Sequence, residues 1–225
     1  MILFVDNEHE SSHDRPEAQR LLAARTRITY RLEDITGDTC LLQRYRKVTP
    51  ELVDRFGIRA VFISGHGAEA SMYDEGDRTG LREVIAAGAT PVFGFCGGLQ
   101  FIGETLGTPL ERIGRIPDGE DDPYPQYQPG WRKEVGYFPV VTVADHPLLE
   151  GLGDEPVFRH AHTWHLPEAP DGFVTLASTA LTAVQLVAHE SLPLAGSQFH
   201  PEYWTDDHPD GEVLIENFCR WVGLL

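Results

Sequence analysis

The stretch PVFGFCGGLQFIGETLG, from Pro91 to Gly107, joins a short apolar run to a second run of helical character, and a cysteine stands between them. The part before Cys96 predicts a buried strand, and the part after it predicts a helix that ends at Gly107. Cys96 is therefore expected at the corner where a strand passes into a helix. The glycines around it suit a sharp bend at which a second chain segment or a substrate approaches the backbone.

The segments around this corner repeat the alternation of strand and helix. The predicted helices cover residues 16–27, 81–88 and 211–225. The predicted strands cover or lie within residues 2–6, 58–64, 131–143, 173–179, 183–189 and 194–200, and several of the later strands are expected to be antiparallel. This order predicts one α/β domain over residues 1–225, with an open, mostly parallel sheet covered by helices on both faces.

The charge balance excludes several classes of partner. Eighteen Lys and Arg against 35 Asp and Glu give a net charge of −17, which disfavours binding to nucleic acid or an anionic membrane. A partner protein is instead expected to present a basic docking surface. The three cysteines, few and widely spaced, predict neither a disulfide scaffold nor a zinc ribbon. Without a membrane-length apolar stretch or a basic leader, the chain is expected to be cytoplasmic.

Residues 116–130, IPDGEDDPYPQYQPG, break the alternation. They are rich in proline, glycine and acidic residues, and they have no apolar period, so they predict a loop or flap. A calcium site is the alternative for so acidic a segment. The ligand spacing of a known calcium loop is missing, which favours a solvated connection.

Two short motifs indicate nucleophilic catalysis. Gly94-x-Cys96-x-Gly98 is the cysteine counterpart of the nucleophile elbow, in which small residues relieve a strained strand-to-helix turn. A buried cysteine in a glycine-rich turn is the alternative. In SQFHPE, residues 197–202, His200 and Glu202 face the same way if the segment is extended, so Glu202 could orient an imidazole that takes the proton of Cys96.

Together, GFCGGLQ and SQFHPE resemble the class I glutamine amidotransferases, whose motifs read Gly-x-Cys-x-Gly-x-Gln and His-Pro-Glu. The resemblance covers most of the chain. It implies a flavodoxin-like α/β fold with a central mixed sheet, and an enzyme that releases ammonia from the side-chain amide of glutamine without a cofactor. By position, Cys96 would attack the amide carbon, His200 would act as general base and acid, and Glu202 would orient His200.

The resemblance also implies which groups bind the oxyanion that forms during the reaction and which line the substrate pocket. The oxyanion would lie between the N–H of Gly97 and one from the turn Gly65–Gly67, and Gln100 would help to line the pocket. This turn departs from the family pattern Ser-Gly-Gly-Pro, because the chain has SGHG at 64–67. His66 is then either a group that contacts substrate or an ordinary surface histidine in a loop.

A second group of histidines lies in FRHAHTWH, residues 158–165. His160 and His162 would share one face of a strand, with His165 nearby, and His-x-His is a known metal-ligand spacing. No carboxylate or cysteine follows at a convincing interval, so no metal is predicted. Arg159 and His160 are instead candidates for the pocket or an interface.

Three functions fit these observations. The first is a glutaminase subunit that supplies ammonia to a separate partner synthase. The second is a stand-alone hydrolase of γ-glutamyl amides or peptides that uses the same three residues. The third is a non-catalytic binding or regulatory paralogue, which would have no need of an intact Cys96, His200 and Glu202.

Overall fold

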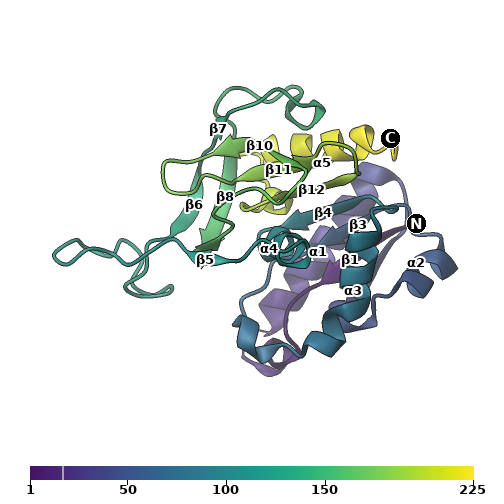
Figure 1. Cartoon of the computed structure of the whole chain (residues 1–225), viewed down its shortest axis with the longest axis horizontal. Coiled ribbons are helices and arrows are strands. Elements are labelled where there is room, and N and C mark those ends of the chain that lie inside the picture. The colour runs from purple at the N-terminus through teal and green to yellow at the C-terminus, as the bar shows by residue number, and fades with distance from the viewer. Residues whose placement is uncertain (17) are drawn as a thin grey trace.

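The computed structural model describes residues 1–16 and 18–225, and its central feature is a mixed sheet of eight strands (Figure 1). The strand order is β2-β1-β3-β4-β12-β11-β10-β7. The first five strands in this order pair in parallel, and the remaining pairs are antiparallel. Their bounds are β1 Ile2–Asp6, β2 Cys40–Arg44, β3 Val61–Ile63, β4 Val92–Phe95, β7 Val141–Thr142, β10 Phe173–Ser178, β11 Leu186–His189 and β12 Leu194–Ser197.

Two antiparallel ribbons extend beyond this sheet. β6 (Glu134–Pro139) pairs with β8 (Val157–His162), and β5 (Glu111–Arg112) pairs with β9 (Trp164–His165). The long connection between β5 and β6 extends to the left in Figure 1. Residues 116–130, all within the described part of the chain, contain no helix or strand, as the composition predicted.

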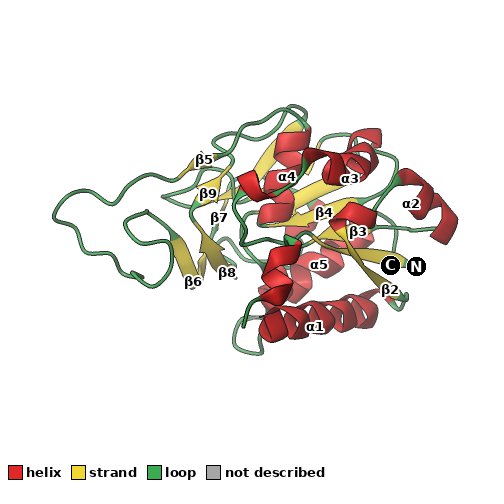
Figure 2. Ribbon diagram, turned by 90° about the horizontal axis from the view of Figure 1, so that it is seen from below, coloured by secondary structure: helices red, strands yellow, loops and turns green. Residues whose placement is uncertain are grey.

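Helices cover both faces of the sheet, as Figure 2 shows. α1 (Ala18–Thr36) and α5 (Asp210–Trp221) lie on one face; α2 (Pro50–Phe56), α3 (Glu75–Ala87) and α4 (Gly97–Thr105) lie on the other. Short 3-10 turns occupy 10–14, 45–47, 70–72, 147–149 and 201–203. The predicted three-layer α/β fold is therefore confirmed. Among the described residues, no helix has both the length and the apolar character needed to cross a bilayer.

Each central strand serves two hydrophobic cores because successive side chains point to opposite faces. In β1, Ile2 and Phe4 pack in the core beneath α1 and α5, whereas Leu3 and Val5 pack in the core beneath α3 and α4. This burial on both faces explains why the strand reads as a continuous apolar run. It also fixes the position of the carboxyl end of β4, which Cys96 follows directly.

The structure differs from the predictions at the ends of elements, in one edge strand and in α2, a short helix that the sequence analysis missed. α1 continues to Thr36, nine residues beyond the predicted end, because Ile28 and Leu32 maintain its buried face. The predicted start at Pro16 lies in a turn, and Glu17 is outside the described residues. β2 was not predicted, since every residue of this edge strand after Cys40 is partly or fully exposed and it has no continuous apolar run.

Gly98 is required where α4 crosses β3. A Cβ at Gly98 would lie 2.3 Å from the carbonyl oxygen of Ile63, a backbone atom that cannot move aside cheaply. Gly98→Ala is therefore expected to lower the free energy of unfolding by about 2–3 kcal/mol through overpacking. Gly153→Ala is the matched control, because a Cβ there meets no described atom within 4 Å. Equal urea midpoints for the two variants would show that the crossing tolerates the methyl group.

Candidate active site

Cys96 stands at a strained corner between β4 and α4. Its φ of 50° and ψ of −105° lie outside the regions that non-glycine residues favour, and its N–H donates to the carbonyl of Ser197 at 2.6 Å. A Cβ at Gly94 would lie 2.4 Å from the carbonyl carbon of Gly98. The flanking glycines thus allow strand and helix to cross at close range, which keeps the cysteine in this conformation.

His200 and Glu202 lie beside this corner. The Nδ1 of His200 is 2.8 Å from Oε1 of Glu202, whose side chain is 1% exposed. A Cβ placed on Gly65 would be 3.0 Å from Cε1 of His200 and 3.4 Å from Cβ of Cys96, so both side chains meet at the same glycine. The structure thus brings together the three residues that the two sequence motifs singled out.

Opposing effects set the pKa of His200. Burial alone would lower it, but the negative charges of Glu202 and of a Cys96 thiolate raise the pKa to about 10. The imidazole is then protonated at neutral pH. An imidazolium beside a cysteine stabilises the thiolate, the nucleophilic form of the side chain.

A cavity of about 420 Å³ opens beside Cys96. This volume suits a small-molecule ligand. Its wall combines a thiol with aromatic, amide and imidazole groups, and includes His66, Cys96, Gln100, Tyr127, His162 and Trp164. Gln100, the glutamine of the cysteine motif, therefore faces the space where a substrate would lie.

A buried chain of amides leads to the sulfur. Gln100 Nε2 donates to Trp164 O at 3.0 Å and to Gln198 Oε1 at 3.1 Å. Gln198 in turn directs its Nε2 to the Sγ of Cys96 at 3.4 Å. An amide donor at this position favours a negatively charged sulfur. The sequence analysis missed Gln198, and its place two residues before His200 was the only signal available.

The turn at residues 65–67 has one N–H group that is already engaged. The N–H of Gly67 donates to Glu8 at 2.7 Å, which leaves the N–H groups of Gly65, His66 and Gly97 as candidates to bind an oxyanion. The backbone nitrogen of His66 lies 2.9 Å from the position of a Cβ on Gly97. Glu8, a buried acid two residues beyond the end of β1, was missed because no motif marks it.

His66 is not an ordinary surface histidine, the second reading that its loop suggested. It is half-buried, it lines the cavity, and its Nδ1 lies 3.1 Å from the carbonyl of Ala68. Burial lowers the pKa of His66. Its neutral ring packs edge-on against Tyr73, with ring centroids 5.4 Å apart.

Lys133 organises the loop that forms one wall of the cavity. Its ammonium is almost fully buried and contacts Asp122 at 2.9 Å. It also donates to the backbone carbonyls of Tyr124, Tyr127 and Gln128 at 2.6–3.1 Å. The Tyr127 hydroxyl donates to the carbonyl of Ala161 in β8 at 3.0 Å. These contacts hold Tyr127 and Gln128 against the site.

Lys133→Met is expected to raise the KM for a cavity ligand on the order of tenfold, with a smaller change in kcat. Three carbonyls and Asp122 lose a charged donor, so the loop loosens without a change to Cys96, His200 or Glu202. Lys47→Met is the matched control, because Lys47 is the only other lysine and is exposed. Steady-state kinetics check the expectation, and an equal KM in the two variants would contradict it.

The remaining candidate residues lie away from the cavity. The backbone carbonyl of Arg159 accepts from the N–H of His200 at 2.8 Å, and its guanidinium lies over the ring of Tyr203. His160 is 1% exposed and does not line the cavity, so the expectation of a pocket or interface residue is wrong. Burial lowers the pKa of His160 to about 3.

Glu134, which the sequence analysis missed, lies next to His160 and His162. Among the described residues, these three form the one group with suitably placed metal-ligand atoms. The carboxylate comes from β6, a neighbouring strand, and spacing along the sequence could not reveal it. His165 is half-buried in β9.

Cys40 and Cys219 are buried in the core, and burial raises the pKa of both thiols to about 12. Neither thiol therefore has the character of a nucleophile.

Comparisons with known proteins agree with the fold and the motifs. The family model described as glutamine amidotransferase class-I matches residues 38–221. A GMP synthase [glutamine-hydrolyzing] from Symbiobacterium thermophilum is 28% identical over 219 residues, which cover 97% of this chain and 36% of that protein. One subunit of the glutamine-hydrolyzing GMP synthase from Methanopyrus kandleri is 32% identical over 147 residues, covering 64% of this chain and 68% of the relative.

Solved structures share the fold. A protein from Thermoplasma acidophilum, described as a putative subunit of GMP synthase, superposes with a TM-score of 0.69 at 21% identity, covering 100% of this chain and 94% of that one. A glutamine amidotransferase from Thermotoga maritima gives a TM-score of 0.64 at 12% identity, with 98% and 97% covered. The chain spans about a third of the length of the first curated GMP synthases that it matches, such as the one from Symbiobacterium thermophilum.

Proposed function

Because this chain belongs to the class-I glutamine amidotransferase family, we propose that it hydrolyses the side-chain amide of glutamine and supplies the ammonia to a partner synthase. One observation carries the proposal furthest: Cys96, at a strained elbow, lies beside the His200–Glu202 pair at the wall of a cavity. A purely structural role would not require this convergence. We further propose that residues 1–225 form a single domain.

The reaction follows from the positions of the groups. The Cys96 thiolate attacks the carboxamide carbon of glutamine, and the developing oxyanion accepts hydrogen bonds from the N–H groups of Gly97 and His66. His200, oriented by Glu202, donates its proton to the leaving ammonia, and a thioester remains on Cys96. Water, activated by the now neutral His200, then attacks the thioester and releases glutamate. The balance is glutamine and water to glutamate and ammonia.

The acceptor of ammonia is proposed to be a synthase that adds nitrogen to another substrate. The name of the Methanopyrus kandleri relative supports this, because it describes one subunit of a glutamine-hydrolyzing GMP synthase. With a net charge of −17, the chain should dock on a basic surface. A cytoplasmic location is part of the proposal, since reducing conditions keep a cysteine nucleophile active.

Glutamate release by the purified chain tests this function against its alternatives. Glutamine and a series of γ-glutamyl peptides are supplied as substrates. Preference for glutamine supports the amidotransferase, and equal or faster turnover of the peptides would favour a stand-alone γ-glutamyl hydrolase. If the chain turns over none of these substrates, and Cys96 does not react with a glutamine-like electrophile, the protein is a non-catalytic paralogue.

A further inference from the structure

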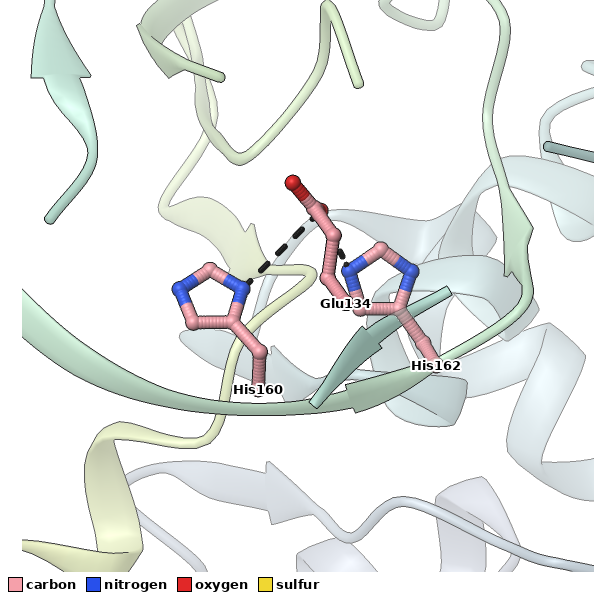
Figure 3. Close-up of side chains that lie close together, drawn as sticks. All are labelled: Glu134, His160 and His162. Carbon is pink, nitrogen blue, oxygen red and sulfur yellow. Dashed lines mark ion pairs between the residues drawn. The ribbon is translucent and has the colours of Figure 1, made fainter. Parts of the chain in front are cut away.

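Figure 3 shows a group of three side chains that lie close together, Glu134, His160 and His162, and one of them, His162, also lines the cavity. They come from the paired strands β6 and β8, in which Glu134 is the direct partner of His162. The two histidines lie two residues apart and therefore point to the same side of β8. All three are 1–4% exposed.

The spacing of the ligand atoms fits a metal ion. Oε2 of Glu134 is 2.8 Å from Nε2 of His162 and 3.9 Å from Nδ1 of His160, and all three atoms lie within 4.8 Å of one another. Zinc bonds of about 2.0–2.1 Å in a tetrahedron place ligand atoms roughly 3.3 Å apart. Small side-chain movements would bring the three atoms to that separation.

The surroundings of His160 in the described part of the chain also indicate that its ring nitrogens lack a polar partner. Among the described residues, no hydrogen bond of regular geometry reaches either ring nitrogen of His160, although its side chain is completely buried; its nearest polar neighbours are Oε2 of Glu134, 3.9 Å from Nδ1, and the backbone of Phe138. Buried polar groups are normally paired, so an unpartnered ring directed at a carboxylate requires an explanation. The stacking of the ring on Phe138, with centroids 3.8 Å apart, accounts for its packing but not for its nitrogens.

The carboxylate is held as the ligands of metal sites commonly are. Glu134 accepts a hydrogen bond from Thr179 on Oε1 and hydrogen bonds from Thr182 and Gln185 on Oε2, and these fix the orientation of the carboxylate. A water molecule would complete a tetrahedral set of four ligands. Two imidazoles and a carboxylate together favour a transition-metal ion such as Zn²⁺ over Ca²⁺ or Mg²⁺.

We propose that Glu134, His160 and His162 bind one divalent transition-metal ion of the zinc type, which fastens β6 to β8. β8 carries His162, which lines the cavity, and Arg159, whose backbone carbonyl accepts a hydrogen bond from His200. By fixing β8, the ion would stabilise the positions of the cavity wall and of His200. The role is structural. It does not depend on the proposed hydrolysis of glutamine.

Metal titration of the full chain tests the proposal, and every protein carries Cys96→Ser because a cysteine beside a histidine can itself bind zinc. His160→Phe removes both nitrogens and keeps an aromatic ring on Phe138. His208→Phe is the matched control, since His208 also stacks on an aromatic residue of β6, Tyr137, outside the cluster. Co²⁺ serves as the spectroscopic probe, and Zn²⁺ is used for affinity and thermal unfolding.

The expected result is one Co²⁺ per chain with visible d–d absorption and no thiolate charge-transfer band, in both the Cys96→Ser protein and the His208→Phe control. His160→Phe should weaken Zn²⁺ binding by about 100-fold or more, and remove the rise in melting temperature that Zn²⁺ causes. Without metal, its melting temperature should equal or exceed that of the parent. If it fails to fold, Glu134→Gln replaces it.

Two outcomes would overturn the proposal. The first is that the metal-free Cys96→Ser protein takes up no Co²⁺ or Zn²⁺. The second is that the His160→Phe or Glu134→Gln variant, shown by circular dichroism to be folded, binds the ion as tightly as its parent.

Discussion

Replacing Cys96 by alanine is expected to reduce glutamate release from glutamine by about 10⁴-fold or more, because no other group can form the thioester. The fold should persist, since the elbow conformation is imposed by the crossing of β4 and α4 and not by the sulfur. Alanine at φ 50° is no more strained than the cysteine that it replaces. Glutamate formation by the purified variant, measured over hours, checks this expectation.

Cys219→Ala provides the control for the loss of a thiol. Cys219 is fully buried in α5, so its replacement should lower the free energy of unfolding and leave turnover unchanged. Substantial glutamate release by the Cys96→Ala variant would contradict the proposed covalent mechanism. Equal loss in both cysteine variants would instead indicate a general effect on stability.

Glu202→Gln is expected to lower kcat by about 10²- to 10⁴-fold with little change in KM, because the substituted side chain keeps the shape of Glu202 but not its charge. The carboxylate orients His200 through the 2.8 Å contact and stabilises its protonated form. Neither effect changes how the substrate binds.

The pH dependence gives a signature that a merely structural residue would not produce. In the parent protein, the imidazolium persists until pH rises to the His200 pKa of about 10, so activity should decline only in that alkaline range. Without the charge of Glu202, one of the two groups that raise the pKa of His200 against the effect of burial is lost, and the pKa falls. The alkaline decline should therefore move to lower pH in Glu202→Gln, and stay unchanged in Glu155→Gln, a control at an exposed site. An unaltered profile would mean that Glu202 does not act on His200.

Local patterns in the sequence predicted the elements that carry the proposed nucleophile. The β4–α4 corner was readable because a continuous apolar run, a cysteine between glycines and a helix lie together in 17 residues. The same holds for His200 and Glu202, which are two residues apart. β2 escaped prediction because an edge strand with partly exposed residues lacks that apolar signal.

The rest of the site depends on contacts between distant segments. Glu8 engages the N–H of Gly67, 59 residues away, and Gln198 reaches Cys96 across 102 residues. Glu134 joins the histidines of β8 only through strand pairing. The composition of residues 116–130 predicted a solvated loop, but the contacts of Lys133 hold part of this loop in place as a wall of the cavity. None of these contacts leaves a spacing pattern in the sequence.

Reaction of the full chain with a diazoketone analogue of glutamine, followed by intact mass and peptide mapping, tests the central claim most directly. The account predicts one adduct per chain, located on Cys96, formed more slowly in the presence of glutamine and lost in Cys96→Ala. This readout does not require a partner synthase. No adduct, or an adduct that glutamine does not slow, would contradict the claim that Cys96 is the nucleophile of a glutamine site.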